Sequence, residues 1–219
     1  MKILLMGPPG VGKGTQSKLI CDFYNITHIS TGDILRNHLT DGTDIGKIVD
    51  KFDIHKGKFV PDYLINDLVK HIHQKDCNHD SYLLDGYPRT LDQAKFYVNE
   101  ILEKNSKYMV IHLSADNEYI LDRICNRMTC SKCGSVYNLK TNSPKVYGIC
   151  DKCMEALIKR EDDDLEIFKK RLDIYNHFTY EAINYFRDLN VLFEVDASKD
   201  IEAIFKKIKK VIGEYYDLY

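Results

Sequence analysis

The chain has 219 residues, enough for one or two domains with a sizeable buried core. Its formal net charge is −2 and its pI is near 6.4, so it has no excess of basic residues of the kind expected in a protein that binds nucleic acid or an anionic membrane surface. No apolar run approaches the roughly 20 residues that span a bilayer, and "KILLM" is too short for the apolar part of a signal peptide. We therefore expect a cytoplasmic protein that binds small molecules, with no nucleic-acid or membrane partner.

Short apolar runs alternate with helical patterns along the chain. Runs typical of strands buried on both faces of a parallel sheet occupy 2–7, 81–86, 108–115 and 191–197, with a less apolar fifth at 27–30. Apolar residues recur at helical spacing over 14–24, 61–73, 90–104, 116–127, 164–187 and 200–213. This alternation predicts an α/β protein, a three-layer fold with right-handed crossovers around a five-stranded parallel sheet. The glycine-rich loop and the family resemblance described below make it a P-loop fold.

Two stretches break the alternation. Residues 31–60 look mainly helical and contain no long strand. Residues 128–160 are rich in Cys, Lys, Gly, Ser and Asn and lack a helical period until their end. We interpret both as insertions into a core domain made of residues 1–30, 61–127 and 161–219.

The stretch "GPPGVGKGT" lies between the first expected strand and the first expected helix. Gly7, Gly12 and Lys13 have the spacing of a phosphate-binding loop. Gly14, however, stands where the pattern has a hydroxyl residue, and Thr15 follows one position later. A glycine-rich turn at such a place directs backbone N–H groups and the positive end of the helix at one anion. Because Lys13 adds a charge for the β and γ phosphates, the stretch predicts a polyphosphate ligand.

Other charged residues suit phosphoryl transfer. Asp85 ends an apolar run, a position suited to holding Mg²⁺ through its waters. The sequence contains no Asn-Lys-x-Asp tetrapeptide, which argues against a GTPase switch. Guanidinium groups neutralise the oxygens of a transferring phosphoryl group, although a single arginine is more often a surface ion-pair former. Six arginines in separate segments of the chain are candidates for this role: Arg36, Arg89, Arg123, Arg127, Arg160 and Arg171.

Four of the seven cysteines form two Cys-x-x-Cys pairs, Cys130 with Cys133 and Cys150 with Cys153, separated by 16 residues. This spacing is typical of a tetrahedral zinc site, and four thiolates leave no open position, so the ion would be structural. A pair of disulfides and iron bound by the same sulfurs are the alternatives. The eight histidines are expected at the surface. Packing roles are expected for Cys21, Cys77 and Cys125.

Several motifs occur in the order and spacing of one known family. The chain resembles the adenylate kinases, among the nucleoside monophosphate kinases, and is most similar to their long-lid, zinc-containing form from residue 1 to about residue 213. The motifs that carry the resemblance are "GPPGVGKGT", "STGDILR", "GKFV", "DGYPRTLDQ", "DRICNR", "REDD" and "KRL".

This resemblance implies a reversible, Mg²⁺-dependent reaction in which ATP and AMP give two ADP. In-line transfer needs no general base, because the AMP phosphate is already an anionic nucleophile. The resemblance further implies a monomer with a helical AMP-binding flap at 31–60 and a zinc-stapled lid at 128–160. Both would close over the substrates and exclude water.

The resemblance also assigns residues to each substrate. For ATP it implies Gly10, Val11, Gly12, Lys13, Gly14, Thr15, Arg123, Arg127, Val136, Tyr137 and Lys199. For AMP it implies Thr31, Arg36, Lys58, Phe59, Val60, Gly86, Tyr87, Pro88, Arg89, Gln93, Arg160 and Arg171. The groups expected to handle the transferring phosphate are Lys13, Asp85, Arg89, Arg123, Arg160 and Arg171. Apart from the resemblance, the acids of "EDDDLE" (161–166) most simply lie at a helix N-terminus, where the dipole favours them, and Asp162 and Asp163 are also candidates for positioning lid arginines.

Gln93 is expected to read the acceptor base, because a side-chain amide both donates to and accepts from the adenine edge. Relatives that phosphorylate UMP and CMP carry an Asn-x-x-Asn-like stretch where this chain has Thr90 and Gln93. GTP as donor, or CMP or UMP as acceptor, is the alternative within the same fold. A zinc-ribbon binding module with a phosphate loop as a switch is an alternative from another class, and it needs a basic, aromatic-bearing surface. The chain departs from its relatives at Met128, where an arginine is common.

Overall fold

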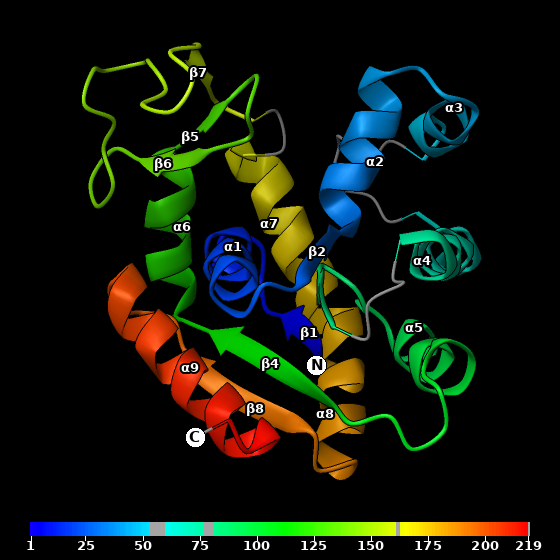
Figure 1. Cartoon of the computed structure of the whole chain (residues 1–219). Helices are drawn as coiled ribbons and strands as arrows, with labels where there is room; N and C mark the ends of the chain where they lie inside the picture. Colours follow the sequence, from blue (N-terminus) through cyan, green and yellow to red (C-terminus); the bar gives the residue numbers. More distant parts are fainter. Residues whose placement is uncertain (53–59, 77–80, 161–162, 219) are drawn as a thin grey trace.

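The computed structural model describes the chain except residues 53–59, 77–80, 161–162 and 219. Its centre is a parallel sheet in the strand order β2-β3-β1-β4-β8 (Figure 1). The five strands are β1 (Lys2–Met6), β2 (Thr27–Ser30), β3 (Tyr82–Asp85), β4 (Tyr108–Ser114) and β8 (Leu192–Asp196). All five expected strands are therefore confirmed.

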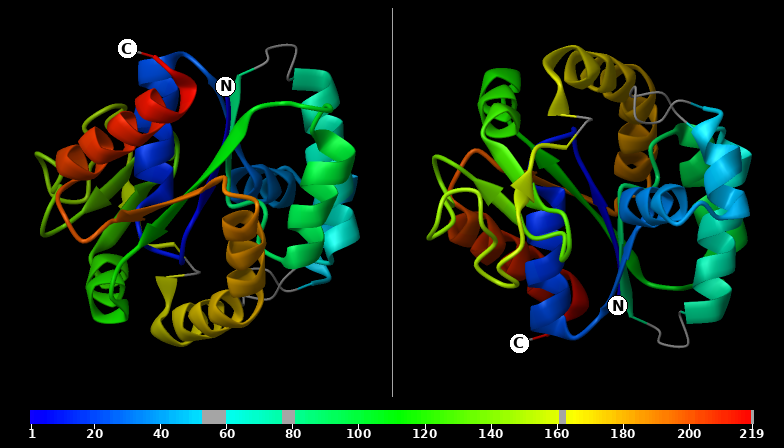
Figure 2. Two further views of the ribbon diagram at one scale, coloured as in Figure 1. Left: turned by 90° about the horizontal axis from the view of Figure 1, so that it is seen from below. Right: turned by 90° about the horizontal axis from the view of Figure 1, so that it is seen from above.

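Both faces of this sheet are buried, which explains why its strands are apolar at nearly every position. Along β1, Ile3 and Leu5 belong to one core cluster, whereas Leu4 and Met6 belong to another. The first cluster is completed by α1 (Lys13–Tyr24), α6 (Asn117–Cys125) and α9 (Ile201–Tyr216). The second is completed by α4 (Asp62–Asp76), α5 (Leu91–Phe96) and α8 (Tyr180–Asp188). The two views in Figure 2 show helices on either side of the sheet, so the three-layer α/β fold is confirmed.

Two of the expected long helices contain a π-helical turn. The helix expected at 90–104 is α5 followed by such a turn, Tyr97–Ile101. The helix expected at 164–187 is α7 (Leu165–Ile174), a π-helical turn at Tyr175–Thr179, and then α8. Such turns are frequent at functional sites, and the second one brings Tyr175 and Thr179 to the cleft described below.

The two expected insertions differ in structure. Within 31–60, the described residues form α2 (Thr31–Thr40) and α3 (Asp44–Asp50), as the mainly helical pattern predicts. The cysteine-bearing segment forms a separate antiparallel sheet, which the sequence analysis did not predict. Its strands are β5 (Arg127–Cys130), β6 (Val136–Asn138) and β7 (Leu157–Ile158). Of the helices that the structure describes, none combines the length and the apolar character needed to cross a membrane.

Candidate functional site

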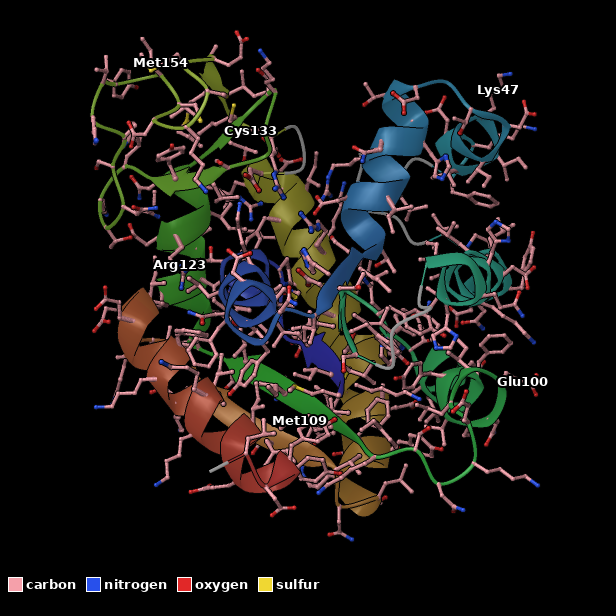
Figure 3. The ribbon with its side chains drawn as sticks, viewed as in Figure 1. Lys47, Glu100, Met109, Arg123, Cys133 and Met154 are labelled. Atoms are coloured by element: carbon pink, nitrogen blue, oxygen red, sulfur yellow. The ribbon has the colours of Figure 1, made fainter. Side chains whose placement is uncertain are left out.

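The candidate site lies at the carboxyl ends of β1, β2 and β3, where open parallel sheets commonly bind ligands. Two adjoining cavities occur there. The first encloses about 1100 Å³ and the second about 1040 Å³, with the solvent at their mouths included. We call the first the apolar cavity, because Leu35, Val60 and Ile65 form part of its wall. The second, which we call the arginine cavity, is lined by Arg36, Arg89, Arg123, Arg127, Arg160 and Arg171. The six arginines singled out from the sequence are thus brought together. Figure 3 labels one of them, Arg123, on α6.

The glycine-rich turn between β1 and α1 forms one side of the arginine cavity. Gly10 has a φ of +83°, and a Cβ there would lie 2.6 Å from the Ile124 side chain, so only glycine fits. Gly12 begins α1 in a left-handed conformation and provides no side-chain cap, and the first turn of α1 carries no acidic residue. The N-terminus of α1 is therefore open to an anion.

Lys13 is the charged residue of the loop that lines both cavities, together with Pro9. Its ammonium donates to the carbonyl oxygens of Gly7 at 2.7 Å and Pro8 at 2.9 Å. Desolvation lowers the pKa of Lys13 to about 7; the Asp85 carboxylate acts in the opposite direction. Repulsion by Arg89, Arg171 and Arg127 lowers this pKa further. A bound polyphosphate would relieve that repulsion, so the charge arrangement favours an anionic ligand.

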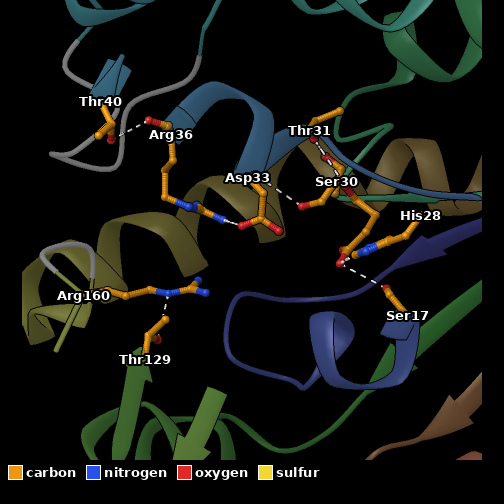
Figure 4. Close-up of polar contacts among 11 residues, drawn as sticks. Ser17, His28, Ser30, Thr31, Asp33, Arg36, Thr40, Thr129 and Arg160 are labelled. Atoms are coloured by element: carbon orange, nitrogen blue, oxygen red, sulfur yellow. Dashed lines mark hydrogen bonds and ion pairs between the residues drawn. The ribbon is translucent and has the colours of Figure 1, made fainter. Parts of the chain in front are cut away.

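The arginines are held in place by neighbouring oxygens. Arg123 donates to the carbonyl of Val11 at 3.2 Å, and Arg89 donates through Nε to the carbonyl of Gly86 at 2.7 Å. Figure 4 shows Arg36 paired with Asp33, and Arg160 Nε donating to Thr129 Oγ1 at 3.1 Å. These contacts hold the guanidinium groups at the wall of the arginine cavity.

Asp163 pairs with Arg127 through both of its carboxylate oxygens. The Asp163 side chain is fully buried, so this ion pair fixes the Arg127 guanidinium at the cavity wall. The expected contact of Asp163 with an arginine is therefore confirmed. Asp162 lies outside the described residues.

Asp85 ends β3 and lines the arginine cavity. Ser17 donates its hydroxyl to Asp85 Oδ2 at 3.1 Å, and His28 Nε2 lies 3.6 Å from the same oxygen. Neither Ser17 nor His28 was singled out from the sequence, because the contact of Ser17 depends on the packing of α1 against β3 and that of His28 on the pairing of β2 with β3.

The apolar cavity gathers most residues that the resemblance assigns to AMP. Thr31, Arg36, Val60, Gly86, Pro88, Arg89, Gln93 and Arg171 all line it. Tyr87 does not line it: its ring is fully buried, and its hydroxyl donates to Asn66 Oδ1 at 2.8 Å. Lys58 and Phe59 lie outside the described residues.

On the other side, the arginine cavity contains most residues assigned to ATP. Gly10, Gly12, Gly14, Thr15, Val136 and Tyr137 line it, together with Asn138, Thr141 and Asn142, which the sequence analysis missed. Val11 contributes its carbonyl to Arg123 while its side chain is buried. Lys199 is exposed and is absent from the lining of this cavity.

Two minor expectations are wrong. His112 is not at the surface: its side chain is 12% exposed, and its Nε2 lies 2.7 Å from the Tyr175 hydroxyl. Burial lowers the pKa of His112, although Glu194 opposes the shift. Its position on β4 explains the burial, since both faces of the sheet are covered. Cys125, expected to pack, is exposed, whereas Cys21 is buried as expected and Cys77 lies outside the described residues.

The four spaced cysteines converge in the antiparallel segment. Their sulfurs all lie within 4.8 Å of one another, with 3.4 Å between Cys130 and Cys153 and 3.6 Å between Cys133 and Cys150. All four are free thiols, and these separations are much longer than the roughly 2.05 Å of a disulfide. Four sulfurs bound tetrahedrally at about 2.3 Å from one ion would lie roughly 3.8 Å apart. The cluster therefore fits a four-coordinate metal ion.

Tyr137 connects this cluster with the arginine cavity. Its hydroxyl lies 3.5 Å from Cys150 Sγ and accepts from the backbone N–H of Asp151 at 2.8 Å, while Tyr137 itself lines the cavity. The cysteine cluster and the wall of the arginine cavity, whose upper part we call its roof, thus share the buried side chain of Tyr137.

Comparison with known proteins gives a consistent result. The profile of a family described as "Adenylate kinase" matches residues 5–191. An adenylate kinase of Fervidobacterium nodosum is 42% identical over 218 residues, covering 98% of this chain and 99% of that protein. One of Clostridium acetobutylicum is 41% identical over 215 residues, covering 98% and 100%. One of Caldanaerobacter subterraneus is 41% identical over 215 residues, covering 97% and 96%.

Proposed function

The chain belongs to the adenylate kinase family, and we propose that its two cavities hold the two nucleotides of the reversible reaction ATP + AMP = 2 ADP. One observation carries this assignment: the apolar cavity and the arginine cavity share Lys13, Arg36, Arg89 and Arg171 in their linings. A phosphoryl group that passes between two nucleotides needs cations at the point where their phosphates meet. The four shared residues supply four such cations.

The donor belongs in the arginine cavity, because that cavity includes the glycine-rich turn and the N-terminus of α1. Gly10, Gly12, Gly14 and Thr15 would surround the ATP phosphates with backbone N–H groups, and Lys13 would place its charge at the β and γ phosphates. Arg123 and Arg127 would neutralise the transferring group from the opposite side. Val136 and Tyr137 would cover the donor nucleotide, and Lys199 is proposed to contact it through its backbone carbonyl.

The acceptor belongs in the apolar cavity. Leu35, Val60 and Ile65 offer an apolar wall for a base, and Gln93 offers an amide for its polar edge. Arg36, Arg89 and Arg171 would bind the AMP phosphate, with Arg160 nearby. Thr31, Gly86 and Pro88 shape the same wall, and Lys58, Phe59 and Tyr87 complete the acceptor site that we propose.

Catalysis by this site is alignment and charge neutralisation. The AMP phosphate is already anionic, so no proton has to be removed and no general base is needed. Mg²⁺ bound with ATP would bridge phosphate oxygens and neutralise their charge, and Asp85 is the carboxylate placed to hold it through waters. We propose that the AMP-binding flap (residues 31–60) and the lid (residues 128–160) close over the core to exclude water.

The cysteine cluster is proposed as a structural zinc site formed by Cys130, Cys133, Cys150 and Cys153. Four thiolates leave no position for substrate, so the ion would cross-link the lid rather than take part in the transfer. Seven cysteines, four of them at metal-ligand rather than disulfide spacing, favour a reducing compartment, which supports a cytoplasmic location. We further propose that the enzyme acts as a monomer, since both cavities are formed by one chain.

The test is a coupled assay of nucleoside diphosphate formation with Mg²⁺. ATP and GTP as donors are crossed with AMP, CMP and UMP as acceptors. We expect fast turnover with ATP and AMP only. Fast turnover with CMP or UMP would contradict the proposed reading of the base by Gln93. Absence of transfer with every pair would contradict a kinase and favour the nucleotide-dependent binding module.

A further inference from the structure

Gln93 is held by hydrogen bonds at both ends of its side-chain amide. The Arg89 backbone N–H donates to Gln93 Oε1 at 2.8 Å, and Gln93 Nε2 donates to Asp62 Oδ1 at 2.6 Å. Gln93 is only 4% exposed, yet it lines the apolar cavity. The amide that faces the acceptor base is therefore fixed before any ligand binds.

These two partners determine which way the amide points. A backbone N–H can only donate and an ionised carboxylate can only accept, so an inverted amide would face a donor with its nitrogen and an acceptor with its oxygen. After these contacts the amide still has one N–H and one oxygen lone pair. The pattern offered to a ligand is thus one donor beside one acceptor, in a fixed order.

Asp62 is the side-chain partner that, beside the Arg89 backbone N–H, fixes that order. Its second oxygen, Oδ2, accepts from the Thr90 hydroxyl at 2.5 Å, and Thr90 Oγ1 in turn accepts from the Gln93 backbone N–H at 3.2 Å. Two donors therefore meet the two oxygens of one side chain. A carboxylate satisfies both, whereas an asparagine at this position would offer a single acceptor, so that either Gln93 Nε2 or the Thr90 hydroxyl would have to change its partner.

We propose that Asp62 is a positioning residue for acceptor specificity, which locks the Gln93 amide in the orientation that selects a 6-aminopurine over a 6-oxopurine. This rests on the proposed function, in which the acceptor base lies in the apolar cavity. Adenine presents an amino donor beside the N1 acceptor, which complements the fixed amide. Hypoxanthine presents a carbonyl beside an N1–H, which matches the inverted amide instead.

The experiment compares AMP with IMP as phosphoryl acceptors, because the two differ only at this edge of the base. kcat and KM are measured for both with MgATP, in the wild-type protein, in Asp62→Asn and in Asp67→Asn. Asp67→Asn is the control, since it removes one charge from an exposed position of the same helix. We expect the ratio of kcat/KM for AMP to that for IMP to fall about tenfold in Asp62→Asn. Most of this fall should come from a higher KM for AMP, and Asp67→Asn should match the wild type.

An equal loss for AMP and IMP in Asp62→Asn would overturn the inference and leave Asp62 a purely structural residue. No ADP formation from AMP by the wild type would instead overturn the proposed function, and this inference with it. Melting temperatures are recorded first, and if Asp62→Asn is unfolded, Asp62→Ala removes both acceptors without adding a donor. Calorimetric binding of AMP and IMP to that variant then gives the same ratio without turnover.

Discussion

The apolar cavity and the arginine cavity share four cationic residues, yet their walls are stabilised by different parts of the molecule. Leu35, Val60 and Ile65 of the apolar cavity belong to the large core cluster on one face of the sheet. The roof of the arginine cavity comes from the lid, whose own buried cluster is Cys130, Tyr137, Cys150 and Leu157. The apolar cavity therefore derives its shape from the hydrophobic core, whereas the roof of the arginine cavity depends on a cysteine cluster that suits a metal ion.

Replacement of Lys13 should have the largest effect, because this side chain lines both cavities. We expect Lys13→Met to lower kcat by about 10³-fold or more, through loss of the charge at the transferring phosphate. Since the pKa of Lys13 is lowered in the folded protein, removing its charge should not lower the melting temperature. Steady-state kinetics and thermal unfolding check both points. Lys47→Met, at an exposed position on α3, is the control, and activity equal to that control would contradict the role of Lys13.

Disruption of the cysteine cluster should affect the proposed donor site and leave the proposed acceptor site unchanged. Cys130→Ser should lower bound zinc and the melting temperature, the latter by roughly 5 °C or more, because the lid has little core of its own. Through Tyr137, the KM for ATP should rise severalfold, whereas binding of AMP should stay unchanged. Elemental analysis, thermal unfolding and two-substrate kinetics measure these effects. Cys125→Ser removes an exposed thiol outside the cluster and serves as the control. Full zinc content with unchanged unfolding would contradict the site.

Truncation of a core side chain beside the apolar cavity should have the opposite pattern, with a larger effect on AMP than on ATP. Ile65→Ala should reduce the free energy of unfolding by about 2–4 kcal/mol, as is typical for truncation of a buried isoleucine. The KM for AMP should rise because Ile65 belongs to the wall of the apolar cavity, while the KM for ATP should stay within about twofold. Equal changes in both KM values would show that the two cavities are not independent.

The smallest expected effect is a proton that accompanies donor binding. In the free protein the pKa of Lys13 is about 7, and a bound polyphosphate should raise it toward its usual value near 10.5. Binding of ATP at about pH 8.5 should therefore take up close to one proton, and binding at about pH 5.5 should take up almost none. Calorimetry in buffers of different ionisation enthalpy measures this number. Lys13→Met should show no such dependence on pH, and proton release by the wild type would contradict the assignment.

The sequence predicts those features of the fold and the site that depend on a local pattern of residues. The glycine-rich turn was recognisable because its function needs particular backbone conformations, and Gly10 shows that no other residue fits. The five strands were recognisable because burial on both faces leaves little room for polar residues. The cysteine cluster was recognisable from ligand spacing alone. Each of these signals lies within one short stretch of the chain.

Residues that act through a partner far along the chain left no such signal. Asp62 meets Gln93 across 31 positions, and Ser17 meets Asp85 across 68, so neither contact follows from local pattern. His112 has the polar character of a surface residue, but the sheet places it between two layers. The strands of the lid escaped prediction because they are short and are held beside a cysteine cluster rather than by an apolar periodicity.

The central claim is that the two cavities bind two nucleotides whose phosphates meet at Lys13, Arg36, Arg89 and Arg171. The most direct test is binding of a single molecule in which two adenosines are joined by a chain of five phosphates. Because one linked ligand would occupy both cavities, it should bind with a stoichiometry of one and displace both labelled ATP and labelled AMP, more tightly than either alone. Displacement of ATP only, or binding of two molecules per chain, would contradict the shared cationic junction.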